Sequence, residues 1–313
     1  MLRSAFAALL LVAALPGCTN MFTEIAANQT TNVMKKAVKS FDSEPDPWLA
    51  YHAALGQLKF AEGVLEAAPE NADLMVLISR NYAQFSYSFI QDELDQATPL
   101  SAEAEALEAR AVSFLKRARS YAVRRLALDF DDAPRAVFAS GDRFDQILAE
   151  CNADEHGAAL YWLAFAWGNL ITVDADNPDH QVDLPRVKKI MGWVRERLPD
   201  FDEGGAHLFF GTIGSALPKS MGGDPEEAKK SFEAAIAVTG GRYLMAKVMY
   251  ARHYSRAVND RRGYRTLLQD VLDAPDDIMS ERQLANTLAK KRAARWLAET
   301  DKHFDTPDRS GAK

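Results

Sequence analysis

The sequence predicts an all-α fold. Apolar residues recur at three- and four-residue steps through nearly every segment after residue 22, which is the period of an amphipathic helix. β-Branched residues are sparse, and no alternating apolar pattern bounded by hairpin turns is present. Because short turns join the successive segments, we expect helix hairpins stacked side by side.

The first clear hairpin lies between residues 46 and 85. An apolar stripe runs through Trp48–Leu65, and Asp46-Pro47 supplies an N-cap and a first-turn proline. Pro69-Glu70-Asn71 then interrupts the chain before a second stripe that ends at Phe85. These signals predict two helices joined by a tight turn.

The later segments predict a total of roughly a dozen helices. Gly157–Val173 is apolar nearly all round, which indicates a buried central helix. Ser280 and Gln283 have the spacing of a capping box before the last helix. The other expected helices are Ala102–Leu128, Leu184–Leu198, His207–Leu217, Pro225–Val238, Tyr243–Val258, Arg261–Leu272 and Glu281–Thr300.

The N-terminus reads as a bacterial lipoprotein signal. Residues 1–17 hold one basic residue and an apolar run too short to span a bilayer, followed by small residues and Cys18. We expect Cys18 to be acylated, residues 18–22 to tether the chain, 23–304 to form the helical domain and 305–313 to be a polar tail. An ordinary signal with a chance cysteine is the alternative. By resemblance to Gram-negative lipoprotein sorting, Thr19 in place of the aspartate of inner-membrane retention favours the periplasmic face of the outer membrane.

The overall charge and the cysteine count narrow the function classes. A net charge of −7 argues against nucleic acid and against electrostatic docking on anionic lipids. Once Cys18 carries lipid, Cys151 stands alone, so no disulfide can staple the fold. A lone cysteine of this kind is typical of a small apolar core residue.

No set of residues in the sequence predicts catalysis, a metal or a cofactor. The six histidines form no zinc motif. The run 174–180 starts like a calcium loop, but Pro178 breaks a ligand position and Pro185 stands where the loop needs a glutamate. Nucleotide-binding and nucleophile-elbow motifs are absent from the sequence as well. We therefore expect a protein that is not an enzyme.

Aromatic residues gather on three of the predicted helices. Core packing is the simplest interpretation, and lining of an apolar cavity or channel between hairpins is the alternative. For the second case we select the following candidate ligand-binding residues: Tyr82, Phe85, Trp162, Phe165 and Phe210.

The stretch Gly222-Gly223-Asp224-Pro225 could be a phosphate cradle or a turn. A cradle needs free amide hydrogens at a helix start and a cation nearby. Asp224 is placed to cap those amides, Pro225 has no amide hydrogen, and Lys219 is the nearest cation on the loop side. We therefore predict a structural turn in which the glycines allow positive φ.

The same region resembles a tetratricopeptide helix, with Ala228 as the small residue and Phe232 as the aromatic one. This predicts degenerate tetratricopeptide-like helix-hairpin repeats closed into a compact helical body. The wider pattern resembles the T component of tripartite ATP-independent periplasmic (TRAP) transporters. The matching segments are His207–Gly211, Ala216–Pro218, Gly222–Ala228, Phe232, Tyr161-Trp162, Ala166-Trp167, Leu284–Ala289, Ala293–Leu297, Arg110-Ala111, Ala118-Arg119 and Tyr121.

The resemblance implies an accessory periplasmic lipoprotein that assembles as a homotrimer. It further implies a pore or cleft in each protomer, docking of the transporter's solute-binding subunit, and a hydrophobic or amphipathic organic-acid ligand. Transport itself would be driven by an ion gradient across separate membrane subunits. The alternative from another class is an outer-membrane scaffold lipoprotein that gathers envelope-assembly proteins on the same repeats.

Overall fold

The computed structural model describes residues 16–139, 141–175, 177, 180 and 182–304, with side chains described from residue 21 onward. Every element in this part of the chain is helical, and no strand occurs in it. The all-α class is therefore confirmed, whereas the tetratricopeptide-like repeat arrangement stays a prediction. Residues 1–15 of the expected signal 1–17, the tail 305–313 and part of the calcium-like loop lie outside the described residues.

The N-terminal half of the fold is built from long helices with short connections. Its elements are α1 (Pro16–Asp42), α2 (Pro47–Ala67), α3 (Ala72–Phe85), the π-helical turn η1 (Ser86–Ile90), α4 (Gln91–Leu94), α5 (Ala102–Ala127), α6 (Ala133–Ala136), α7 (Arg143–Glu150) and α8 (Ala153–Val173). The predicted tether 18–22 falls within α1.

The C-terminal half has shorter helices and more irregular turns. Its elements are α10 (Leu184–Arg197), α11 (Gly205–Ala216), the 3₁₀ turn η2 (Lys219–Met221), α12 (Pro225–Val238), α13 (Leu244–Met249), the π-helical turn η3 (Tyr250–Ser255), α14 (Arg261–Asp273), the 3₁₀ turn η4 (Ser280–Arg282), α15 (Gln283–Ala298) and α16 (Thr300–His303).

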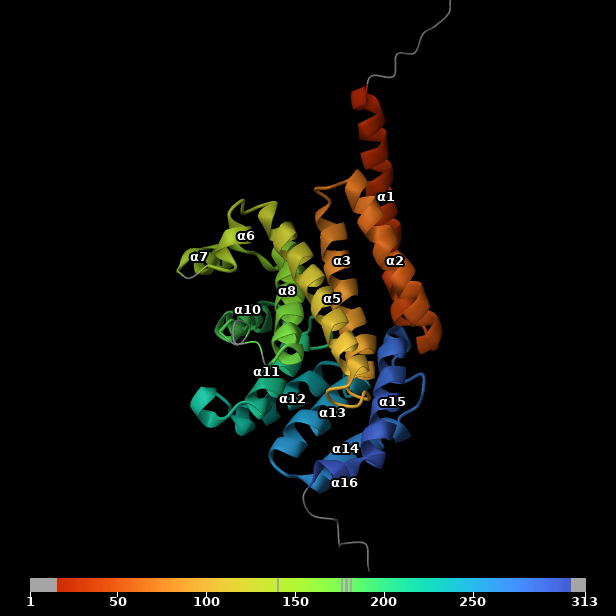
Figure 1. The fold of residues 1–313 in the computed structure, drawn as a ribbon, viewed down its shortest axis with the longest axis vertical. Coiled ribbons are helices and arrows are strands. Elements are labelled where there is room, and N and C mark those ends of the chain that lie inside the picture. Colours follow the sequence, from red (N-terminus) through yellow and green to blue (C-terminus); the bar gives the residue numbers. More distant parts are fainter. Residues whose placement is uncertain (1–15, 140, 176, 178–179, 181, 305–313) are drawn as a thin grey trace, which may run out of the picture.

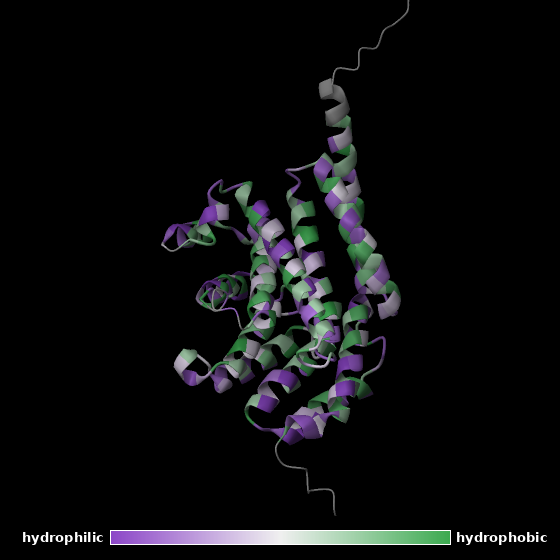
Figure 2. Ribbon diagram, in the orientation of Figure 1, coloured by the Kyte–Doolittle hydropathy of each residue, from purple (hydrophilic) through white to green (hydrophobic). Residues whose placement is uncertain are grey.

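Helices α3, α5 and α8 form the centre of the molecule (Figure 1). The α1–α2 hairpin flanks α3 on one side, α10 packs on α8 from the other, and α13–α16 close one end of the bundle. Figure 2 shows hydrophobic residues along α8 and hydrophilic ones on the outer side of α14 and α16. Twelve of the 21 residues of α8 are buried, which confirms it as the central helix.

The cap predicted at Asp46 is confirmed, Asn71 of the predicted chain break proves to be a cap as well, and a third predicted cap is absent. Asp46 accepts a hydrogen bond from the Trp48 amide at 2.9 Å, and Asn71 accepts one from the Leu74 amide at 2.8 Å. The capping box predicted at Ser280 is wrong. Helix α15 starts after Arg282 with no side-chain cap, because Ser280 lies in a preceding 3₁₀ turn.

The glycine pair before α12 forms a structural turn. Gly222 has φ 86°, and a Cβ at Gly223 would lie 1.8 Å from the carbonyl oxygen of Leu217. The Asp224 carboxylate accepts from the amides of Glu226 and Glu227, at 3.0 and 3.2 Å, which confirms the predicted cap. Only the first glycine therefore needs positive φ, whereas the second is needed for close backbone approach.

One cation near this turn was not predicted from the sequence. A Cβ at Gly222 would lie 3.4 Å from Lys188 Nζ, so Lys219 is not alone there. The amides at the start of α12 are nevertheless taken by the Asp224 carboxylate, which would repel an anion. The turn interpretation stands.

Two predicted helices contain π-helical turns that periodicity did not indicate. The segment predicted as one helix, Tyr243–Val258, is α13 followed by η3, and α3 runs directly into η1. A π-helical turn inserts one residue into the helix, which shifts the faces of the following side chains. No helix in the described part of the chain is long and apolar enough to cross a membrane.

Candidate ligand cavity

A cavity of about 570 Å³ lies between the N-terminal and C-terminal halves. Helices α2, α3, α8 and α11 and both π-helical turns contribute to its walls. This volume is within the range of small-molecule sites. The apolar side chains on the walls include Phe89, Phe209, Leu208, Met245, Leu284 and Leu288.

Two of the five aromatic residues selected from the sequence line this cavity. Phe85 comes from the last turn of α3, and Phe165 comes from the middle of α8. Phe85 packs against Phe89 with ring centroids 5.2 Å apart, and Phe165 packs edge-on against Tyr87 at 5.8 Å. The cavity wall is therefore continuous from α3 through η1 to α8.

The other three selected residues lie outside the cavity lining. The Tyr82 hydroxyl donates to Glu62 Oε1 at 2.7 Å, and Trp162 is buried against Phe165. Phe210 lies beneath the Arg195 guanidinium, 4.0 Å from its ring centroid, while its neighbour Phe209 faces the cavity. Ligand binding by these five residues stays a prediction.

Polar side chains also reach the cavity wall. Gln57, Gln84 and Ser88 come from α2, α3 and η1, and Asn169 and Thr212 come from α8 and α11. Thr212 Oγ1 is buried and has no hydrogen-bond partner among the described residues. An unpaired hydroxyl inside an apolar wall is a group that a bound ligand could hydrogen-bond.

The cavity wall includes an ion-pair cluster centred on Arg282. Its guanidinium lies 2.6 Å from Asp42, 2.8 Å from Glu203 and 3.6 Å from Asp202. Burial lowers the pKa of Arg282, but the three carboxylates outweigh burial and raise it. Arg80 also binds Asp42, with both contacts at 2.7 Å.

Glu203 differs in character from the other carboxylates of this cluster. Burial and the neighbouring Asp202 raise the pKa of Glu203, while Arg282 acts in the opposite direction. The Asp202 carboxylate also accepts from the Tyr161 hydroxyl at 2.7 Å. The positive charge of Arg282 is therefore already matched by three acidic groups.

A strained backbone turn holds the two acids in place. Asp202, Glu203 and Gly204 have φ of 48°, 56° and 80°, so three successive residues lie in the left-handed region. Non-glycine residues reach this region at a cost of about 1–2 kcal/mol each. The contacts of Asp202 and Glu203 with Arg282 help to offset that cost.

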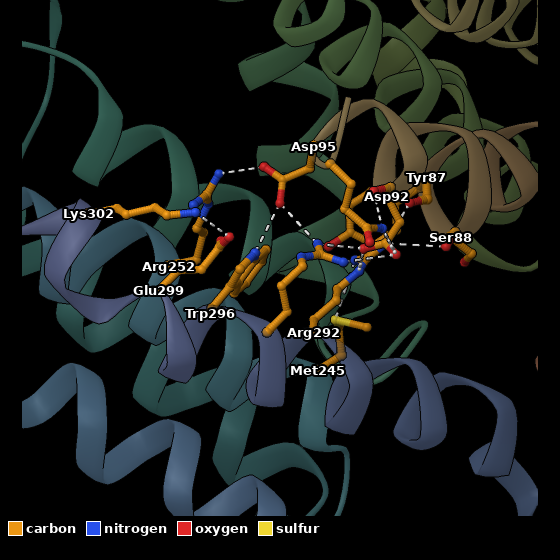
Figure 3. A network of polar contacts seen from close by, with 12 residues as sticks. Tyr87, Ser88, Asp92, Asp95, Met245, Arg252, Arg292, Trp296, Glu299 and Lys302 are labelled. Atoms are coloured by element: carbon orange, nitrogen blue, oxygen red, sulfur yellow. Dashed lines mark hydrogen bonds and ion pairs between the residues drawn. The ribbon is translucent and has the colours of Figure 1, made fainter. Parts of the chain in front are cut away.

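A second ion-pair network fixes the wall at η1 (Figure 3). The buried Arg292 on α15 donates to the carbonyl oxygens of Tyr87 and Ser88, at 2.8 and 3.3 Å, and to Asp92 at 2.9 Å. Asp95 accepts from Arg252, Arg295 and Trp296 in the same network. Helix α15 of the C-terminal half is therefore hydrogen-bonded directly to the π-helical turn of the N-terminal half.

The described residues provide no metal cluster, since no group of three His, Cys, Asp or Glu side chains is placed to hold an ion. Cys151 is buried, and burial raises the pKa of its thiol to about 12. Because the thiolate is the reactive form, this cysteine is unreactive at neutral pH.

Comparison with known proteins gives the family. Residues 43–304 match the family described as TRAP transporter T-component. This chain belongs to that family. The match extends from the residue after α1 to the residue after α16, so it includes the cavity-lining helices except α1, which contributes Phe41 and Asp42 to the wall. Family membership makes the chain an accessory component of a TRAP transport system, in a family that is not one of enzymes, with an envelope-associated location.

A relative in Treponema pallidum (strain Nichols) is 26% identical over 269 residues, which cover 82% of this chain and 80% of that protein. It is described only as an uncharacterized protein. This relative resembles the chain over most of its length, but its description names no substrate or partner.

Sequence reasoning found Phe85 and Phe165 but missed the residues at the π-helical turns. Tyr87, Ser88 and His253 line the cavity from η1 and η3, where the helical period is broken. A single helical period continued through either segment predicts the wrong face for these side chains. The run Phe85-Ser86-Tyr87-Ser88-Phe89 was the available signal, because its aromatic residues alternate with serines and do not keep to one helical stripe.

Proposed function

We propose that this T-component docks the solute-binding subunit of its TRAP transporter and receives a hydrophobic or amphipathic organic-acid ligand in the 570 Å³ cavity. The observation that carries the proposal is the position of the cavity. It lies between two halves of one chain, is walled mainly by apolar side chains, and holds an unpaired buried hydroxyl at Thr212.

Ligand content tests the cavity directly. The protein purified from its native host is denatured, extracted into organic solvent, and the extract is compared by mass spectrometry with that of an Ala285→Trp variant. Ala285 lines the cavity, so the large indole fills part of it. A stoichiometric small molecule in the wild-type extract that is reduced in the variant supports the proposal. Equal content in both contradicts it.

Docking is tested with the solute-binding subunit encoded beside this chain. We expect the two proteins to co-purify and to give a complex in native mass spectrometry with ligand present. A clean failure to associate contradicts this part of the proposal and favours the scaffold alternative. Capture of envelope-assembly proteins in the same experiment would strengthen that alternative.

We also propose that Cys18 is acylated, that the protein is held at the periplasmic face of the outer membrane, and that it forms a homotrimer. Family membership and the cysteine after the apolar run support these three statements. Metabolic labelling with a clickable palmitate analogue, with Cys18→Ser as control, tests the anchor. Membrane fractionation tests the location, and native mass spectrometry tests the number of chains.

A further inference from the structure

A second pocket, of about 550 Å³, adjoins the apolar cavity. The two share Ala216, Leu217 and His253 in their walls. The second pocket is open to the surface, and its charged and titratable wall residues are all basic: Arg252, His253, Arg256 and His303. The apolar cavity therefore leads to a cationic surface pocket.

Arg256 is the unmatched cation of this pocket. Arg252 lies 2.7 Å from Asp95, which also binds Arg295. Among the described residues, no carboxylate forms an ion pair with Arg256, and its own turn of helix places it beside Arg252. Burial and the neighbouring Arg252 lower the pKa of Arg256, which remains a strong base and keeps its charge at neutral pH.

The two histidines add unused hydrogen-bonding atoms. His303 Nε2 is buried and has no hydrogen-bond partner among the described residues. Burial with Arg252 and Arg256 lowers the pKa of His253 to about 4, and burial with the same two arginines lowers that of His303. Both rings are therefore neutral at pH 7. Each can donate one N–H to an acceptor without adding a positive charge beside Arg252 and Arg256.

The cations of the Arg282 cluster on the cavity wall are matched by carboxylates. Arg282 pairs with Asp42, Asp202 and Glu203, and Arg80 pairs with Asp42. An anion placed there would meet three carboxylates. Of these two charged sites, only the pocket of Arg256 offers a cation that a carboxylate could pair with.

We propose that the pocket formed by Arg252, His253, Arg256 and His303 binds the carboxylate headgroup of an amphipathic acid whose apolar part lies in the adjoining cavity. This inference rests on the proposed function of the cavity and adds the headgroup site and the direction in which the ligand lies. Arg256 pairs with the carboxylate, and His253 at the junction and His303 in the second pocket donate hydrogen bonds to it.

Matched probes with and without a charge test the headgroup site. Decanoate and decan-1-ol have the same chain, so calorimetric titration of the purified protein with each isolates the contribution of the carboxylate. We expect decanoate to bind more tightly than decanol. Arg256→Gln keeps an unbranched polar side chain but removes the charge, and it should weaken decanoate by about tenfold or more while changing decanol less than about twofold.

Arg265→Gln is the matched control, since Arg265 is an exposed arginine on α14 that lines neither pocket. Arg256→Lys should retain part of the preference for decanoate, and circular dichroism checks that each variant is folded. Equal binding of both probes, or unchanged decanoate binding by Arg256→Gln, overturns the headgroup site and leaves the cavity in place. Binding of neither probe overturns the proposed cavity function and the headgroup site with it.

Discussion

The Arg292 guanidinium on α15 donates to the carbonyl oxygen of Tyr87 at 2.8 Å, across 205 positions of the sequence. Tyr87 lies in the π-helical turn η1, which forms part of the cavity wall. Asp92, one turn further on, accepts from the same guanidinium at 2.9 Å. A single buried side chain thereby joins the wall of the cavity to the C-terminal helices (Figure 3).

Replacing Arg292 by methionine should lower the free energy of unfolding by about 3 kcal/mol, the usual loss when one partner of a buried ion pair is removed. The expected decrease is measured by urea denaturation. Lys291→Met, on the exposed side of the same helix, is the control and should change stability by less than about 0.5 kcal/mol. Similar losses for the two variants would show that the Tyr87 contact has no special role.

Phe165 and Trp162 should respond differently to substitution, because only Phe165 lines the cavity. Trp162 is 2% exposed, so Trp162→Ala should cost about 3–5 kcal/mol through a new internal void. Phe165→Asp places its charge beside the cavity, so we expect a folded protein that has lost binding of decan-1-ol. Thermal melting and titration measure the two effects. Complete unfolding of the Phe165 variant would mean that this ring is core.

The turn before α12 should tolerate alanine poorly at both glycines. Gly222→Ala would carry a Cβ at φ 86° and should cost about 1–2 kcal/mol. Gly223→Ala should cost more, because its Cβ would overlap the Leu217 carbonyl and force the backbone apart. Gly63→Ala in α2 has open space around it and should stabilise by about 0.5–1 kcal/mol. Denaturant titration of the three variants gives the order, and a harmless Gly223→Ala would contradict the close approach.

Stability should fall as the pH drops from about 6.5 to about 4, because the folded state holds His253 with a pKa lowered to about 4 from the usual 6.5. The unfolded chain takes up a proton on this ring within that window and the folded protein does not, so unfolding is favoured. The pKa of His303 is lowered too and acts in the same direction.

His253→Gln should therefore reduce the loss of stability between pH 6.5 and pH 4, as measured by denaturant titration at a series of pH values. His52→Gln, on the exposed face of α2, is the matched control. An unchanged pH profile in His253→Gln would show that the ring is not held neutral. The measurement needs no ligand, so it is independent of the headgroup proposal.

Much of the fold follows from local signals. The start and end of α12 agree with the predicted Pro225–Val238, because Asp224 and Pro225 define its first turn without help from the rest of the chain. The central position of α8 follows from its apolar composition, since a helix that is hydrophobic all round has to be covered.

The candidate site was predictable only in part. Phe85 and Phe165 could be selected because an aromatic side chain on a buried helix packs either in the core or on the wall of an internal cavity. Tyr82 is as aromatic and as buried, but its hydroxyl is drawn away by Glu62, a residue of α2. The period of a helix says which face is apolar and does not say which neighbour that face meets.

By itself the sequence determined the helical class, the caps of α2 and α12 and the family, because each of these depends on residues close together in the chain or on their order. Tertiary structure alone decided the cavity, the pairing of Arg282 with three carboxylates and the absence of such a partner for Arg256 among the described residues. These depend on contacts such as Arg282 with Asp42, which lie 240 positions apart. Such pairings are set by how whole helices pack, and no local pattern records them.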